Sequence, residues 1–251
     1  SVSGLTTPGA TGLTGLDRLP MSILLYRHVL QWLGGIGIIV VAVAVLPRLG
    51  IGGMQLYRAE TPGPTKDTKL TPRITETAKA LFSVYLLLTV ACALAYGAAG
   101  MSGFDAVCHA FSTVAIGGFS THDASMGHFD SAAIYLVCSL FMLVSAVNFG
   151  MHYTAWMRRQ PGIYYRDPET RFFLGVLAVC ALITTGYLAL SQTLPELDAL
   201  VHGLFQAVSI TTTTGYATQD FAAWPSFLPV MLLMFSFMGG CVGSTGGGIK
   251  A

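Results

Sequence analysis

The chain has 251 residues, of which 53% are hydrophobic and 10% are charged, and its formal net charge is +1. Soluble domains carry about 25% charged residues, so this composition excludes a water-soluble globular protein and indicates a membrane protein. The sequence shows no basic patch that would bind a nucleic acid.

The apolar residues lie in long blocks, which predict helices that cross the membrane. A span needs about 20 apolar residues, and we expect spans at residues 21–46, 75–99, 131–156, 171–190 and from 223 onward. Two shorter helices are predicted at 104–113 and 198–209. They are too short to cross a bilayer, and a polar glycine loop follows each, which is typical of a re-entrant element that lines a pore.

Three segments align without a gap on a central glycine. They read SGLTTPGAT from Ser3, STVAIGGFS from Ser112 and SITTTTGYA from Ser209, so that each glycine has a serine six residues before it. The glycines are 109 and 97 residues apart, which indicates a repeated unit of about a hundred residues with two helices and a loop. We expect the units at residues 1–60, where the first helix of the unit is missing, 61–165 and 166–251.

The charged residues are sorted along the chain, and this predicts its orientation. The connectors between units hold 10 of the 13 basic residues, which are Arg48, Arg58, Lys66, Lys69, Arg73, Lys79, Arg158, Arg159, Arg166 and Arg171. Because Lys and Arg accumulate in short cytoplasmic loops, we expect the connectors to face the cytoplasm. The segments around the glycine loops are acidic instead, with Asp17, Asp105, Asp123, Asp130, Glu196, Asp198 and Asp220. The loops should therefore open outward, where an acidic rim would concentrate cations.

The glycine loops fit a filter made of backbone. A filter replaces the water shell of a cation with carbonyl oxygens, and glycine permits the dihedral angles this requires. The stretches 6–9, 115–118 and 212–215 contain no charged side chain, which favours selection of a monovalent cation. Any one of these loops could equally be an ordinary turn, but three in register favour the filter.

A glycine-rich stretch interrupts the last apolar segment. It contains six glycines, each costing about 1 kcal/mol against alanine in a helix, so we expect unwound backbone beneath the filter that can obstruct or clear the pore. The alternative is a surface for close helix packing, which is the role we expect for Gly34, Gly35 and Gly37. The predicted gating residues are Gly239, Gly240, Gly243, Ser244, Thr245, Gly246, Gly247, Gly248 and Lys250.

Catalytic and metal-binding chemistry is not indicated by the side chains. The six histidines are dispersed without the spacing of metal ligands, so structural or interfacial roles are favoured. His122 and His128 lie near the predicted mouth and could affect the response to pH. The sequence shows no grouping of nucleophile, base and orienting residue, so we do not expect an enzyme.

With these residues in hand, the chain resembles the Trk/Ktr/HKT superfamily of potassium transporters. The matching motifs are the residues 3–11, 31–37, 119–125, 211–217 and 243–250. The resemblance implies an all-α polytopic membrane protein with helix, pore-loop, helix repeats of the potassium-channel type around a pseudo-fourfold pore. Its fourth repeat would be absent from this chain. Potassium would be the substrate, with no covalent cofactor, held by the backbone of Thr7, Pro8, Gly9, Ile116, Gly117, Gly118, Thr213, Thr214 and Gly215.

The resemblance also implies a setting and partners. These are the bacterial inner membrane with its lipid, a homodimer, pore loops facing the periplasm, and a cytoplasmic nucleotide-binding ring of the TrkA type. Pro8 stands where many members have Thr, so the fine selectivity is left open, as is symport with protons or sodium. A sodium-permeable or non-selective channel is the alternative function, and a membrane scaffold with a vestigial pore is a third.

Overall fold

Helices of 3 to 25 residues make up all the regular structure in the part of the chain that the computed structural model describes, which is residues 1–45, 74–225, 227–241 and 243–248. The expectation of an all-α fold is confirmed. The α-helices are α1 (Val2–Leu5), α2 (Met21–Val45), α4 (Ile74–Ala98), α5 (Gly103–Val114), α6 (Ala132–Ser145), α7 (Phe149–Arg158), α8 (Ile163–Arg166), α9 (Pro168–Leu190), α10 (Glu196–Thr211) and α11 (Phe227–Ser236). Three short 3-10 turns are η1 (Leu16–Arg18), η3 (Ser125–Phe129) and η4 (Phe221–Ala223).

Two helices are long and apolar enough to cross a membrane, within the described residues, and they are Ala78–Ala98 of α4 and Pro168–Leu190. Their outer faces are apolar, since the side chains of Leu94, Leu182 and Leu190 are 70%, 72% and 87% exposed. Apolar side chains on an outer surface suit contact with lipid. Composition, span length and surface together make this a membrane protein.

The helix predicted at 131–156 is not continuous. The chain instead forms α6 and α7, which meet at an angle of 91°. Backbone groups at the break pair with a distant segment, because the Ala146 carbonyl accepts from the Cys241 N–H at 2.9 Å and the Phe149 N–H donates to the Gly243 carbonyl at 3.1 Å. The Asn148 side chain caps α7 by accepting from the Gly150 N–H at 2.7 Å. These partners replace bonds that a continuous helix would make.

The other helix boundaries differ from the predicted ones by a few residues. The helix expected from residue 171 begins three residues earlier, because Asp167 caps it and Pro168 takes its first position. The span expected from residue 223 begins at Phe227, since residues 221–223 form η4 after an Asp220 cap. The predicted unit boundaries at 60 and 165 remain predictions, and the first of them falls outside the described residues.

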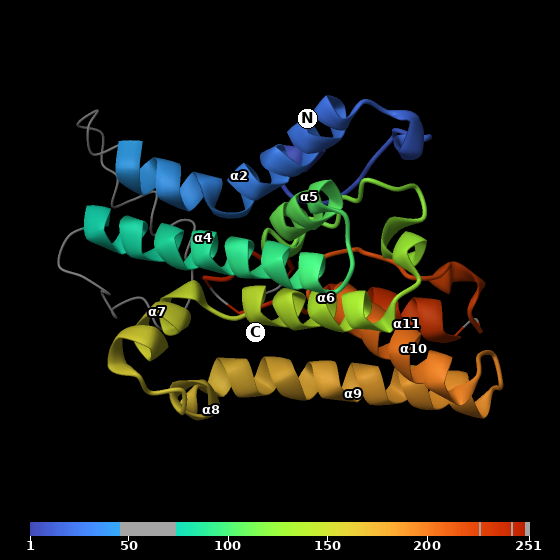
Figure 1. Cartoon of the computed structure of the whole chain (residues 1–251). Coiled ribbons are helices and arrows are strands. Elements are labelled where there is room, and N and C mark those ends of the chain that lie inside the picture. Colours follow the sequence, from blue (N-terminus) through green and yellow to red (C-terminus); the bar gives the residue numbers. More distant parts are fainter. Residues whose placement is uncertain (46–73, 226, 242, 249–251) are drawn as a thin grey trace.

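The short helix α5 lies inside the molecule, packed against α2, α4 and α6 (Figure 1). A large apolar core surrounds it, with Tyr85 and Tyr96 of α4, Met142 of α6 and Tyr216 after α10 almost fully buried. A second core joins α9, α10 and α11. All five cysteines are free and buried.

The two ends of the bundle differ in charge as the sequence predicts. Figure 1 shows α7, α8 and the start of α9 at one end, and this end carries the described connector residues Arg158, Arg166 and Arg171. The starts of α5, α6 and α10, with their acidic residues, lie at the opposite end. The basic residues from Arg48 to Arg73 lie outside the described residues.

Candidate ion pathway

The three glycine loops share one backbone conformation. Each begins at the residue that ends a short helix, with φ between −90° and −75° and ψ near 0°, at Thr6, Ala115 and Thr212. The next residue and the glycine two positions later are both left-handed, at φ values of 59° and 71°, 52° and 73°, and 65° and 85°. These pairs are Thr7 and Gly9, Ile116 and Gly118, and Thr213 and Gly215.

Left-handed β-branched residues are outliers in protein structures, and such strain concentrates at functional sites. Here the outlier recurs at the equivalent position of all three loops, at Thr7, Ile116 and Thr213. When left-handed residues alternate with right-handed or extended ones, successive peptide groups turn the same way instead of alternating. A row of carbonyl oxygens along one side of the loop requires this geometry.

The central glycines also bring neighbouring loops into contact. A Cβ on Gly9 would overlap the carbonyl oxygen of Gly117, and a Cβ on Gly118 would overlap the carbonyl oxygen of Thr214. Each glycine therefore faces the residue before the glycine of the next loop along the chain. A Cβ on Gly215 would meet nothing within 4 Å among the described residues.

Backbone hydrogen bonds fix the start of the second and third loops. The Gly117 N–H donates to the Ser112 carbonyl at 2.8 Å, and the Thr214 N–H donates to the Ser209 carbonyl at 2.9 Å. These bonds close the helix end in the pattern of a Schellman motif. Pro8 occupies the equivalent position in the first loop and has no N–H to donate, so this loop keeps only the Thr7 N–H bond to Gly4, at 3.2 Å.

The repeated serine ties the first and third loops from their far side. The Ser3 hydroxyl donates to the Ala10 carbonyl at 2.6 Å, and the Ser209 hydroxyl donates to the Tyr216 carbonyl at 2.7 Å. In both cases the acceptor is the residue after the central glycine. The serine of the second unit, Ser112, instead pairs with Nδ1 of His28 at 2.6 Å.

Gln31 braces the second loop, a role that sequence reasoning missed. Its fully buried amide donates to the Gly117 carbonyl at 2.6 Å and accepts from the Phe119 N–H at 3.1 Å. A glutamine inside the apolar run of α2 was the available signal, because a buried amide needs hydrogen-bond partners. Tyr96 is a second residue of this kind, and its hydroxyl pairs with Thr113 at the end of α5 at 2.8 Å.

The glycine-rich stretch after α11 is unwound, as predicted, and lies against the bases of the loops. The Thr245 hydroxyl donates to the Val114 carbonyl at 2.9 Å, and the Gly247 N–H donates to the Thr213 hydroxyl at 2.8 Å. Gly239, Gly243 and Gly248 are left-handed, at φ values of 56°, 76° and 81°. Lys250 lies outside the described residues.

Close packing explains two of the three glycines singled out in α2. A Cβ on Gly34 would overlap the Leu5 carbonyl oxygen, and a Cβ on Gly35 would lie 2.9 Å from the Cα of Ala115. Both glycines let α2 approach the start of a loop. For Gly37 a Cβ would meet nothing within 4 Å among the described residues, so its expected packing role stays a prediction.

Comparison with known proteins identifies the family. Residues 1–251 match the family model TrkH, described as a cation transport protein. The chain belongs to the TrkH family. It is 60% identical over its whole length to the Trk system potassium uptake protein TrkH of Halomonas elongata and 56% identical to that of Escherichia coli K12. The crystal structure of the potassium transporter TrkH from Vibrio parahaemolyticus aligns with a TM-score of 0.86 at 53% identity, covering 100% of this chain and 51% of that one. The chain thus spans about half the length of the curated relatives it matches, 52% in both.

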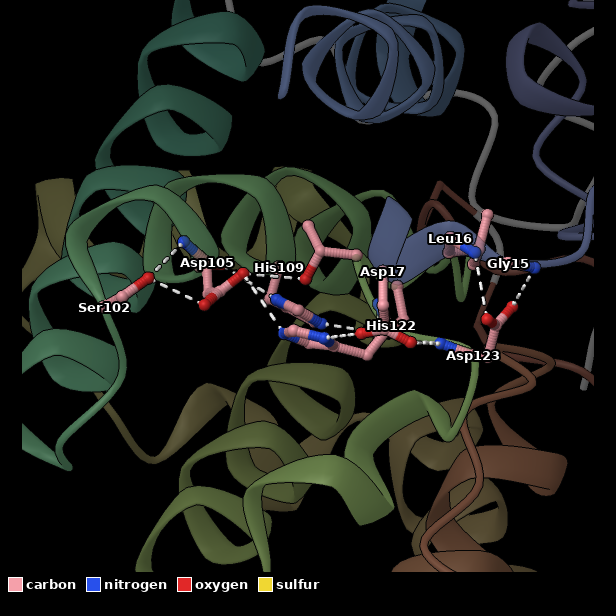
Figure 2. Close-up of polar contacts among 10 residues, drawn as sticks. Gly15, Leu16, Asp17, Ser102, Asp105, His109, His122 and Asp123 are labelled. Atoms are coloured by element: carbon pink, nitrogen blue, oxygen red, sulfur yellow. Dashed lines mark hydrogen bonds and ion pairs between the residues drawn. The ribbon is translucent and has the colours of Figure 1, made fainter. Parts of the chain in front are cut away.

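In this TrkH-family chain the segments that follow the first two glycine loops are joined by carboxylates (Figure 2). Asp123 accepts from the N–H groups of Gly15 and Leu16 at 3.1 and 2.9 Å. Asp17 pairs with Nδ1 of His122 at 2.5 Å. This hydrogen bond from His122 lowers the pKa of the exposed Asp17 carboxyl from 3.8. Sequence spacing could not reveal the pair, because its members are 105 residues apart.

Proposed function

We propose that the chain forms three of the four walls of a potassium pathway in a channel-like uptake transporter. The observation that carries the proposal is the shared left-handed pair in each loop, with a β-branched first member and a glycine as the second. This geometry supports rows of carbonyl oxygens at residues 7–9, 116–118 and 213–215. The names of the relatives, which are potassium uptake proteins, support potassium as the cation.

The short helices and the membrane potential assist entry of a cation. Helices α5 and α10 end where the second and third loops begin, so the negative ends of their dipoles lie at the filter. In a bacterial inner membrane with the loops facing the periplasm, the potential drives entry with about 2.3 kcal/mol per charge per 100 mV. The acidic outer end of the bundle raises the local cation concentration.

The unwound stretch at 239–248 acts as the gate. Thr245 and Gly247 hold it against the second and third units, directly beneath the loops. Opening requires these bonds to break. The gate is also bonded to Ala146 and Phe149 at the break between α6 and α7, and α7 leads to the basic connector end. A cytoplasmic nucleotide-binding ring of the TrkA type, acting on a homodimer, would control the gate through these elements.

Weaker selectivity, with sodium passing as well, is the second candidate. The observation that favours it is the missing hydrogen bond at Pro8, which leaves the first loop less firmly fixed than the other two. Filter carbonyls that can shift discriminate less between cations of different size.

Growth of a potassium-uptake-deficient bacterium at low potassium tests the proposal, with the full-length gene and with rubidium and sodium fluxes measured in parallel. The Gly215→Ser variant changes a left-handed filter residue. Gly12→Ser is the matched control, because a Cβ on Gly12 meets nothing within 4 Å. Rescue by wild type and by Gly12→Ser, with selectivity lost in Gly215→Ser, is expected. Rescue with equal sodium flux in wild type would favour the second candidate, and no flux from well-expressed protein would favour a scaffold.

A further inference from the structure

A cluster of metal-ligating side chains lies at the outer end of the molecule, separate from the filter loops. It consists of Asp17 in η1 of the first unit, His122, and His128 in η3 of the second unit. One ligand atom from each residue lies within 4.8 Å of the other two. We propose that these three side chains bind a divalent transition-metal ion of the zinc class.

The donor set determines the class of ion. Two imidazoles and one carboxylate suit zinc and related transition metals, whereas magnesium and calcium prefer oxygen ligands alone. Zinc binds nitrogen and oxygen at about 2.0–2.2 Å, so its tetrahedral ligand atoms lie roughly 3.4 Å apart. The three ligand atoms lie within 4.8 Å of one another, and Nδ1 of His122 is 2.5 Å from Asp17, so modest side-chain rotations would bring all three to this spacing.

The two imidazole rings are already held together. Their centroids are 3.4 Å apart and their planes differ by 5°, although no hydrogen bond joins the rings. A metal binds to the lone pair of a neutral imidazole. Rotation of the exposed His128 ring out of the stack would turn its lone pair toward the same point.

His122 is placed to be the central ligand. Its Nδ1 faces Asp17, while its Nε2 is buried without a hydrogen-bond partner and lies 3.6 Å from Oδ1 of Asp105. If Nδ1 binds the metal together with Asp17, the ring proton moves to Nε2 and faces Asp105. A histidine ligand that donates its other N–H to a carboxylate is the usual second-shell arrangement at zinc sites.

The backbone around the cluster is fixed before any metal binds. Asp123 holds the segment that carries Asp17 through the N–H groups of Gly15 and Leu16, and Asp105 accepts from the Thr121 hydroxyl at 2.7 Å. Asp17, Asp105 and Asp123 place three carboxylates around the cluster, with Arg18 as the neighbouring cation in sequence. The side chain of Asp17 is 47% exposed, so an ion can enter from solvent. A preorganised, accessible and acidic site favours a divalent cation.

Zinc binding to the purified, metal-stripped full-length protein tests the proposal by isothermal titration calorimetry. Wild type is compared with His122→Gln and His128→Gln, which keep polar side chains of similar length. Asp130→Asn is the control, because it removes a carboxylate from the same outer face without touching the cluster, and asparagine tolerates the left-handed conformation at this position. This test needs no ion flux, so its result is independent of the proposed potassium pathway.

We expect one zinc ion per wild-type chain, with affinity at least about tenfold lower in both histidine variants and unchanged in Asp130→Asn. Zinc should also raise the thermal unfolding midpoint of wild type and of Asp130→Asn, but not that of the two histidine variants. The proposal is overturned if wild type binds no zinc, or if all variants bind it equally. If His122→Gln does not fold, the His128→Gln variant alone decides, since the His128 side chain makes no hydrogen bond within the described part of the chain.

Discussion

Replacement of Gly118 by alanine should damage the filter more than any other single methyl group added to the second loop. Two independent costs arise at this residue. Its φ of 73° is left-handed, which costs alanine about 1–2 kcal/mol. The added Cβ would also overlap the Thr214 carbonyl oxygen of the third loop, and overpacking of this kind costs about 1–3 kcal/mol. The sum is roughly 2–5 kcal/mol if the loops do not move.

The strained loops can relieve part of this cost by moving apart, and that movement displaces the Thr214 carbonyl. We therefore expect the ratio of rubidium to sodium uptake to fall by at least about tenfold, which corresponds to 1.4 kcal/mol of lost discrimination. The assay uses the full-length transporter in uptake-deficient cells, with thermal unfolding of the purified protein in parallel. Gly12→Ala is the control, since neither cost applies there, and surface changes of this kind stay within about 0.5 kcal/mol.

A Gly118→Ala protein that folds, reaches the membrane and keeps the wild-type uptake ratio would refute this reasoning. Such a result would mean that the contact between the second and third loops does not set selectivity. Equal losses in Gly118→Ala and Gly12→Ala would refute it as well, because they would show an effect of the added methyl group that is unrelated to backbone conformation.

Three further predictions concern the surroundings of the loops. Gln31→Leu leaves two buried backbone groups of the second loop without their partner, so the purified protein should lose about 2–6 kcal/mol of unfolding free energy, measured by denaturant titration; an unchanged transition midpoint would contradict the bracing role. Thr245→Val removes the hydroxyl that holds the gate to Val114, and a loss of about 1 kcal/mol should raise basal rubidium flux about fivefold; unchanged flux would place the gate elsewhere. The hydrogen bond from His122 lowers the pKa of Asp17, so its contribution to stability is present above pH 3.8 and lost as the pH falls through the lowered pKa. In the Asp17→Asn variant the unfolding midpoint should therefore fall less steeply as the pH is lowered into the acidic range. The same fall as in wild type would show that the Asp17–His122 pair does not stabilise the fold.

The long helices and the left-handed conformation of the glycine loops could be predicted because their physical requirements act locally on the sequence. A membrane helix must be apolar over its whole length, and α4 and α9 accordingly begin and end within three residues of their predicted limits. A left-handed residue that lies against another chain segment has no room for a Cβ. Gly9 and Gly118 both meet this condition, and they occupy the same position in their aligned loops.

The break between α6 and α7 depends on partners that are distant in sequence. The apolar run through Val144 and Val147 predicts one helix, whereas the backbone bonds to Cys241 and Gly243 favour two. The Asn148 cap is a local signal for the start of α7, yet asparagine also occurs inside helices. Helix length and composition alone could not settle the choice.

The sequence did not reveal the Gln31 contact with the second loop or the cluster of Asp17, His122 and His128, for a related reason. The Gln31 amide reaches Gly117, 86 residues away, and Asp17 reaches His122, 105 residues away. Spacing rules for metal ligands apply to residues on one turn, hairpin or helix. Side chains that meet only when two repeats pack together fall outside such rules.

Rubidium anomalous diffraction from crystals of the full-length protein tests the central claim most directly, because it locates the transported ion among named atoms. The account predicts peaks on the axis of the pathway, ringed by backbone carbonyl oxygens of residues 7–9, 116–118 and 213–215. Peaks confined to the acidic rim around Asp17 and Asp123, with none between the loops, would contradict it.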